Sequence, residues 1–538
     1  MNEILPYELA KTRLTPGQKV AQLFMPAAFI NDSEEEIQKL EALIRDYGVG
    51  GLCFFHSRAS AATNFEGKRK VEYNEHSLQT LKNLIARYQK AASIPLLIAI
   101  DAEWGLAMRI ENTPQYPYAI TLGAIRGQDG LIYEVGRNIA LDCKKAGIHW
   151  NFAPVADINL NPENPVIGYR SFGEDKKEVA QKAIAFMQGM QSGGVLCCAK
   201  HFPGHGDTTT DSHLGLPVIN KDLETLKSQE LYPFAQMIAA GVEAIMVGHL
   251  SVPALGRGDQ TPATLSPAII QEVLRNDMRF QGVVVSDALN MHSVSRLYPE
   301  KGRLEWEAFH AGNEVLCFAE HVEEGISIIL QHAPAGKIDQ AFGRVWELKR
   351  KALQPASGVS APAMSPETLN RKLAAASLSM VLGNKEDIDE FRKSKAFILE
   401  VSNCPGRAFL GCLQKEVAGL KSACADPSAT SLTEGLAGPG GILVALYPPS
   451  VKPPNNFGFS TGVLQALNRL LEEREVVVYN FGNPYVLNLL AYQKAKAVVQ
   501  VYQDFGSFQE NAALHFLGRT QATGILPVTL KNILNHDI

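Results

Sequence analysis

Short apolar runs alternate with longer amphipathic segments between residues 20 and 320. Four of the longer segments have the apolar spacing of helices, over residues 34–47, 77–92, 130–146 and 176–192. The apolar runs cover residues 21–29, 50–55, 95–100, 149–158, 194–199, 244–249, 282–286 and 314–318. Apolar strands that alternate with helices indicate a parallel sheet covered on both faces. Eight such units predict an α/β fold, a closed TIM (β/α)8 barrel, and an open doubly wound sheet is the competing arrangement.

A small, Pro-rich stretch over residues 354–366 ends this pattern and is typical of a linker. We expect a helix over Pro366–Leu382, followed by strands over 396–401, 441–447, 475–479 and 497–502. These elements predict a smaller α/β sandwich. The expected organisation is a barrel over residues 1–353, a linker over 354–375 and a C-terminal domain over 376–538.

The composition is that of a soluble globular protein, with 46% hydrophobic and 20% charged residues among 538. A net charge of −5 provides no basic surface for nucleic acid, and no apolar run is long enough to span a membrane. The first 18 residues lack the apolar core of a signal peptide, so we expect a cytoplasmic protein. A periplasmic location is the alternative, if a signal sequence was removed ahead of Met1. Nothing in the sequence indicates the oligomeric state.

The loop from Lys200 to His213 is the stretch richest in proton-transfer groups, and it reads Lys-His-Phe-Pro-Gly-His-Gly-Asp-Thr-Thr-Thr-Asp-Ser-His. Within it, Asp211 and His213 have the arrangement of an acid/base pair, in which a carboxylate orients an imidazole. The three histidines at 201, 205 and 213 are an alternative metal site, but no Cys-x-x-Cys pair accompanies them and the spacing is not that of a zinc helix. We therefore expect no metal and no cofactor. A purely structural His-rich turn is the other alternative.

Polar residues with catalytic potential follow the ends of several predicted strands. They are Asp101, Asp157, Lys200, His201, His249 and Asp287. In a barrel the carboxyl ends of the strands meet on one face, where active sites are built. Asp287 has two interpretations: it caps the next helix, or it is a nucleophile that uses the proton donor of the loop. Arg109 and Arg170 either bridge carboxylates or bind the paired hydroxyls of a sugar.

The chain resembles glycoside hydrolase family 3, and within it the β-N-acetylglucosaminidases of the NagZ type. The resemblance covers residues 10–350 and is carried by the Lys200–His213 loop followed by Leu-Gly-Leu-Pro217. The family usually reads Asp-x-Glu-Gly-Gly-Arg after the third strand, and Trp104 and Leu106 depart from that pattern. The C-terminal domain resembles the α/β sandwich of the family. It is structural, mediates dimerisation or borders the substrate cleft.

The resemblance implies a role for each matching residue. Asp287 is the implied nucleophile, His213 the acid/base and Asp211 the residue that orients His213. Sugar binding is implied for Asp101, Arg109, Arg170, Lys200 and His201.

The implied activity is that of a retaining β-N-acetylglucosaminidase, which hydrolyses terminal β-linked GlcNAc through a glycosyl-aspartate intermediate. The implied substrates are GlcNAc-containing fragments of peptidoglycan or chitin. A family 3 β-glucosidase, a GlcNAc phosphorylase and a non-catalytic sugar-binding protein are the alternatives. Phosphorolysis is included because a histidine acid/base does not repel an incoming phosphate.

Overall fold

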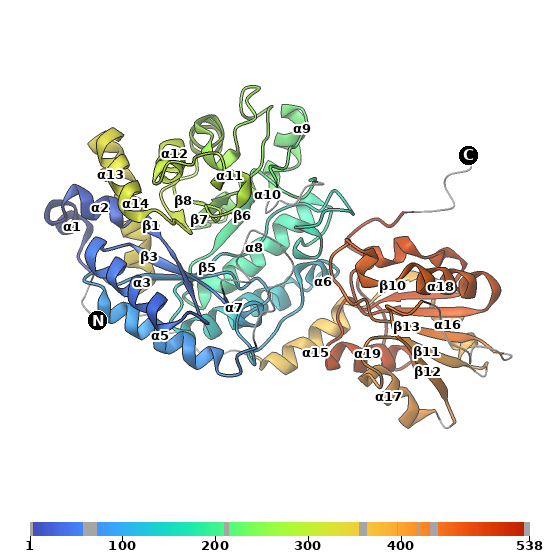
Figure 1. Ribbon diagram of the computed structural model, residues 1–538. Helices are drawn as coiled ribbons and strands as arrows, with labels where there is room; N and C mark the ends of the chain where they lie inside the picture. The colour runs from blue at the N-terminus through green and yellow to red at the C-terminus, as the bar shows by residue number, and fades with distance from the viewer. Residues whose placement is uncertain are drawn as a thin grey trace. The chain divides into compact units, whose positions relative to one another are not determined.

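The computed structural model describes residues 4–57, 73–208, 215–354, 363–394, 396–417, 419–430 and 440–531. The chain divides into two compact units (Figure 1). The first comprises residues 1–116, 132–158 and 179–363, and the second comprises 117–131, 159–178 and 364–538. The second unit therefore takes in two segments of the N-terminal half of the chain. The domain boundaries expected at 353 and 376 stay a prediction.

The strands of the first unit form a closed parallel ring. They are β1 (Phe24–Met25), β2 (Ala27–Phe29), β3 (Gly51–Phe55), β4 (Leu97–Ile100), β5 (Trp150–Asn151), β6 (Cys198–Phe202), β7 (Ala244–Val247), β8 (Val283–Ser286) and β9 (Leu316–Cys317). Parallel pairing runs from β2 to β5 and from β6 to β8, and β9 pairs with β1. Bridges from Trp150 to Leu196 and from Val285 to Val315 join these groups. Because β1 and β2 are one strand interrupted at Pro26, the ring has eight strands, and the open sheet is excluded for this unit.

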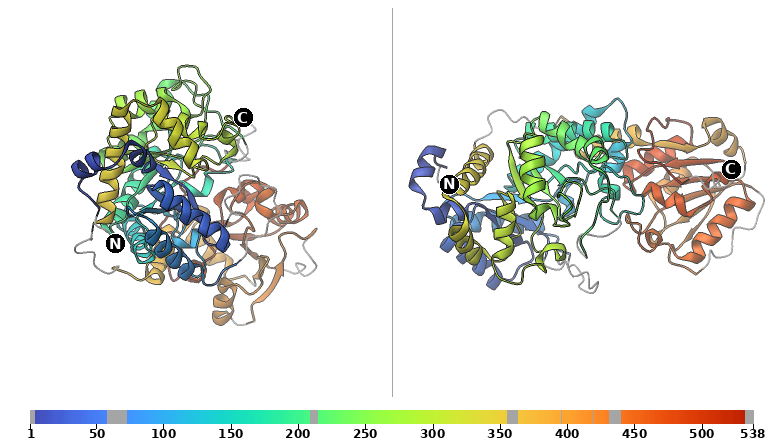
Figure 2. Two further views of the ribbon diagram at one scale, coloured as in Figure 1. Left: turned by 60° about the vertical axis from the view of Figure 1, so that its left-hand side comes forward. Right: turned by 90° about the horizontal axis from the view of Figure 1, so that it is seen from above.

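Helices surround the ring, as the two views of Figure 2 show. They are α1 (Tyr7–Arg13), α2 (Pro16–Ala21), α3 (Glu34–Tyr47), α5 (Ser77–Ala91), α7 (Asp129–Ala146), α8 (Lys176–Ser192), α9 (Leu223–Ser228), α10 (Leu231–Ala239), α11 (His292–Ser295), α12 (Arg303–Ala311), α13 (Val322–His332) and α14 (Ala335–Leu353). The four predicted helices are confirmed, each to within one residue at either end. The two ends of α3 are set by residues next to them. Ser33 and Glu36 form a capping box at its start, and Gly48 ends the helix at a φ of 69°.

The second unit contains a six-stranded sheet. Its strands are β10 (Ser379–Leu382), β11 (Phe397–Val401), β12 (Lys421–Ala425), β13 (Ile442–Leu446), β14 (Val476–Asn480) and β15 (Ala497–Gln500), in the order β10-β15-β14-β13-β11-β12. Its helices are α6 (Ala119–Gly123), α15 (Pro366–Ser377), α16 (Lys385–Phe391), α17 (Ala408–Glu416), α18 (Thr461–Glu473) and α19 (Gly506–Phe516). The expected α/β sandwich is confirmed.

Helices cover both faces of this sheet, with α18 on one side and α17 and α19 on the other (Figure 1). Side chains that alternate between the two faces along β14 explain why helices cover both. Val478 belongs to the same apolar cluster as Leu467 of α18, whereas the neighbouring Tyr479 lies against Phe409 of α17 and Phe516 of α19. Successive side chains of a strand point to opposite faces, so each face has its own helical cover.

One predicted helix is wrong at its C-terminal end. We expected a helix over Pro366–Leu382, but α15 ends at Ser377 and β10 takes residues 379–382. Strand β10 pairs antiparallel with β15 at the edge of the sheet. The local apolar pattern is compatible with either element, and pairing with a partner more than a hundred residues away decides it. Within the described residues, no helix is both long and apolar enough to cross a membrane.

Candidate active site

The polar residues expected at strand ends lie together on the C-terminal rim of the ring. Asp101 follows β4, His249 follows β7 and Asp287 follows β8. Lys200 and His201 were expected just after a strand, but they lie within it, because β6 extends over Cys198–Phe202. The loop that we expected to begin at Lys200 therefore begins after the strand. Since the strands are parallel, these carboxyl ends share one face.

The ammonium group of Lys200 is held between two carboxylates. Its Nζ lies 2.7 Å from Asp101 Oδ1 and 2.7 Å from Glu103 Oε1. Arg109 adds a second cation, with Nη2 3.3 Å from Asp101 Oδ2. Burial alone would raise the pKa of Asp101, but the charges of Lys200 and Arg109 outweigh it and hold that pKa below its usual range. The result is an ionised cluster of donors and acceptors suited to paired hydroxyl groups.

Arg109 is fixed on its other side by an aromatic ring. Its guanidinium carbon lies 5.4 Å from the centroid of Phe55, which in turn lies 5.1 Å from the ring of Phe318. The backbone before it requires a glycine: Gly105 has a φ of +98°, and a Cβ there would lie 2.9 Å from the carbonyl oxygen of Pro114. The pair of Asp101 and Arg109 thus forms although Trp104 and Leu106 depart from the family pattern.

Asp157 is a fully buried carboxylate that anchors the start of the loop. Its Oδ2 lies 2.7 Å from His201 Nδ1, and its Oδ1 accepts from the backbone N–H groups of His201 at 3.1 Å and His205 at 2.8 Å. Burial would raise the pKa of Asp157, but the neighbouring His201 and His205 lower it overall. An ionised carboxylate only accepts, so His201 Nδ1 carries a proton and Asp157 fixes the orientation of the ring.

His205 is buried, and its ring centroid lies 5.9 Å from that of His201. Its Nδ1 lies 2.9 Å from Thr208 Oγ1. Burial and the charge of His201 lower the pKa of His205 to about 4, so this ring is neutral at pH 7. Across the described part of the chain, no group of three or more His, Cys, Asp or Glu side chains is placed to hold a metal ion.

Asp287 does not cap a helix, which removes one of its two interpretations. Its backbone N–H donates to the carbonyl of Val247 at 3.0 Å, and its Oδ1 accepts from the N–H of Ala288 at 2.8 Å. The next helix, α11, begins only at His292, with Met291 at its N-cap position. The carboxylate is partly exposed on the rim, as a nucleophile requires.

His249 supports the peptide that follows Asp287. Its Nε2 lies 2.9 Å from the carbonyl oxygen of Ala288, and its Nδ1 lies 2.8 Å from Thr264 Oγ1. A carbonyl oxygen only accepts, so Nε2 carries the proton of this buried ring. We infer that His249 positions the backbone next to Asp287.

Three of the expected site residues stay untested. Arg170 belongs to the second compact unit, where its Nη1 donates to the carbonyl of Val166 at 3.3 Å. Asp211 and His213 lie outside the described residues. Their roles stay predictions.

Sequence reasoning assigned no role to Glu103, Asp157 or His249, and each makes a close contact in the cluster. A signal existed for all three. Glu103 lies two residues after Asp101, and the other two were recognised as strand-end residues. What the sequence does not contain is the partner of each side chain.

Residues 15–348 match the family model of the glycosyl hydrolase family 3 N-terminal domain. The chain is 36% identical over 292 residues to a protein named beta-hexosaminidase A from Pseudoalteromonas piscicida, which covers 52% of this chain and 47% of that protein. It is 35% identical over 285 residues to a beta-hexosaminidase of Neisseria meningitidis serogroup C (strain FAM18), covering 51% of this chain and 72% of that protein.

A solved structure is similar over nearly the whole chain. It is a glycoside hydrolase family 3 beta-N-acetylglucosaminidase from Paenibacillus sp. str. FPU-7. The TM-score is 0.74 at 27% sequence identity, and the match covers 96% of this chain and 99% of that one. The similarity therefore extends over both compact units, beyond the region that matches the family domain.

Proposed function

The chain belongs to glycosyl hydrolase family 3, and on this premise we propose that it is a retaining β-N-acetylglucosaminidase. The expectation of a glycoside hydrolase is thereby confirmed. The narrower activity is supported by the names of the similar proteins, which are beta-hexosaminidases and a beta-N-acetylglucosaminidase.

The observation that carries the proposal is the position of Asp287. It is a partly exposed carboxylate with no capping role, on the same rim as the ion-paired cluster of Asp101, Lys200 and Arg109. In the first step Asp287 attacks the anomeric carbon, and the bonding electrons of the glycosidic bond move to the leaving oxygen. His213 donates its proton to that oxygen. The product is a glycosyl ester of Asp287.

In the second step a water molecule attacks the same carbon. His213, now neutral, removes a proton from that water, and the ester bond breaks to regenerate the Asp287 carboxylate. A retaining glycosidase normally uses two carboxyl groups. A histidine in place of one of them titrates near neutral pH and places no second negative charge beside the nucleophile.

The remaining residues of the cluster bind the sugar. Asp101 accepts from hydroxyl groups, whereas Lys200 and Arg109 donate to hydroxyl oxygens. The ring of His201 is oriented by Asp157, which holds its Nδ1. Because the cluster is held together before substrate arrives, little has to be ordered on binding.

The substrate class is the finer part of the proposal. We propose GlcNAc-containing fragments of the cell wall, with chitin fragments as the competing source. Kinetics on GlcNAc-1,6-anhydroMurNAc and on chitobiose, measured in parallel, distinguish the two, since only the leaving half differs.

The test uses hydrolysis of 4-nitrophenyl β-N-acetylglucosaminide. We expect Asp287→Ala to abolish turnover, while Asp277→Ala, at an exposed aspartate, retains it. His213→Ala should spare this activated substrate and lose unactivated ones. Equal loss in the Asp287 and His213 variants, or initial release of the α-anomer by NMR, contradicts the mechanism. A product that becomes a sugar phosphate when phosphate is added indicates the phosphorylase instead.

A further inference from the structure

The loop after β6 leaves the barrel and returns to it, and the structure describes both of its limbs. The outgoing limb is residues 203–208, and the returning limb is residues 215–221. The outgoing limb is anchored by the Asp157 carboxylate. The returning limb pairs with the segment after β7, because the N–H of Ile219 donates to the carbonyl of Ser251 at 2.9 Å. Each limb therefore has its own contact with the barrel.

An ion pair joins the two limbs directly. Lys221 Nζ, on the returning limb, lies 2.7 Å from Asp207 Oδ2 on the outgoing limb. It also lies 2.6 Å from Oε1 of Glu230, the residue before α10, whose side chain is 3% exposed. Burial alone would lower the pKa of Lys221, but its hydrogen bonds to Asp207 and Glu230 outweigh burial and raise that pKa. The three side chains are therefore held as an ionised group at pH 7, which we call the Lys221 clasp.

Glu230 also supports the turn at which the outgoing limb begins. The N–H of Gly204 donates to the carbonyl of His201 at 2.8 Å, which forms that turn. Gly204 has a φ of +125°, and a Cβ there would lie only 3.0 Å from the Cβ of Glu230. The turn therefore lies directly against the Glu230 side chain. Glu230 holds the outgoing limb by packing and, through Lys221, holds both limbs by charge.

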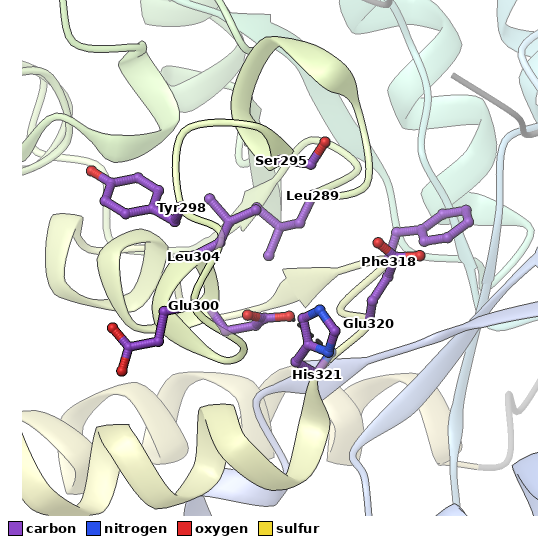
Figure 3. A pocket seen from close by; sticks show the side chains of 9 residues that line it. Leu289, Ser295, Tyr298, Glu300, Leu304, Phe318, Glu320 and His321 are labelled. Atoms are coloured by element: carbon purple, nitrogen blue, oxygen red, sulfur yellow. Dashed lines mark hydrogen bonds between the residues drawn. The ribbon is translucent and has the colours of Figure 1, made fainter. Parts of the chain in front are cut away.

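The burial of Glu230 does not by itself require a lysine. Glu305 is a buried carboxylate of the same unit, and it lines a cavity of about 50 Å³ with Leu289 and His321 (Figure 3). Its Oε1 accepts from the backbone N–H of His321 at 3.0 Å, and its Oε2 has no hydrogen-bond partner among the described residues. A carboxylate is thus buried there with a backbone donor alone. Lys221 differs because it contacts carboxylates on two separate segments and so joins them.

We propose that the Lys221 clasp positions His213 for proton donation to the leaving oxygen, which makes Asp207 and Lys221 positioning residues. The inference rests on the proposed β-N-acetylglucosaminidase activity. His213 belongs to residues 209–214, which lie outside the described residues and connect the two limbs. Holding the ends of a chain segment together reduces the number of conformations open to the chain between them. A general acid also needs exact placement, because a displacement of about 1 Å can cost roughly 100-fold in rate.

The experiment measures how strongly turnover depends on the leaving group. Chitobiose needs a proton on its leaving oxygen, whereas 4-nitrophenyl β-N-acetylglucosaminide releases a stable anion and needs little protonation. We expect Asp207→Asn and Lys221→Met each to lower kcat/KM for chitobiose by roughly tenfold and for the aryl glycoside by less than about twofold. Lys221→Arg keeps the charge and should recover most of the chitobiose activity. Lys227→Met, at an exposed lysine of α9, is the control and should change neither value.

The double variant Asp207→Asn/Lys221→Met should lose no more than Lys221→Met alone, because both changes break the same contact. Should Lys221→Met not fold, Asp207→Asn decides, since it keeps the buried pair of Lys221 and Glu230. An unchanged ratio of the two kcat/KM values overturns the inference. An equal fall on both substrates also overturns it, because that result indicates a purely structural role. If the unmodified protein hydrolyses neither substrate, the proposed function itself fails, and the inference fails with it.

Discussion

Replacing Lys200 with methionine removes one charge and keeps most of the side-chain volume. In the structure the Lys200 side chain is 2% exposed, and its ammonium lies 2.7 Å from each of two carboxylates, Asp101 and Glu103. Without it Asp101 keeps its ion pair with Arg109 at 3.3 Å. Glu103 loses its ion pair with Lys200 in a largely buried position.

The magnitude follows from this geometry. Removing one partner of a buried ion pair costs about 3–5 kcal/mol. Arg109 still compensates Asp101, so we place the loss in the free energy of unfolding near the lower limit, about 3 kcal/mol at pH 7. The pKa values of both carboxyl groups should rise in the variant. A group whose folded-state pKa exceeds its unfolded value loses stability as pH rises, so the deficit should shrink from pH 7 to pH 5.

Two measurements check this prediction. Urea unfolding at pH 5 and pH 7 gives the stability difference, and hydrolysis of the chromogenic glycoside gives kcat/KM, which should fall by roughly 10- to 100-fold for one lost charge-assisted hydrogen bond. The double variant Lys200→Met/Glu103→Gln should recover part of the stability without recovering activity. A loss below about 1 kcal/mol, or a deficit that grows toward pH 5, refutes the reasoning.

Three further predictions concern the supporting residues. Asp157→Asn places an amide where three N–H donors converge, so we expect a loss of about 2–4 kcal/mol in urea unfolding and at least a tenfold fall in kcat/KM; near-normal values of both disprove the anchoring role. Gly105→Ala should lower stability by roughly 1–3 kcal/mol and raise KM through Arg109, whereas Gly336→Ala, in a helix with open space around it, should not lower it. Lys349 is buried, and burial lowers its pKa to about 7. Above that pH the unfolded protein binds more protons than the folded one, so the free energy of unfolding should rise from pH 7 to pH 9 by about 2 kcal/mol relative to Lys349→Met. Curves of unfolding free energy against pH that run parallel for the two proteins contradict this.

The sequence by itself determined the elements and the reaction class. Apolar runs of strand length alternate with amphipathic segments, and this periodicity depends only on which face each residue presents. Helices such as α3 begin and end at caps that are encoded within a few residues. The residues after each strand were recognisable for the same reason, because parallel strands carry their functional groups at one end. Asp287, Asp101 and Lys200 could be named as candidates without a structure.

Only the tertiary structure decided which of these residues touch one another. Glu103 shares Lys200 with Asp101, and Asp157 holds His201, across separations of about 40 to 100 residues that no local pattern records. The same applies to β10, which looked helical until its pairing with β15 was known. The physical reason is that ion pairing, burial and strand pairing depend on distances in space, and the chain sets those distances only when the whole ring and sheet have closed.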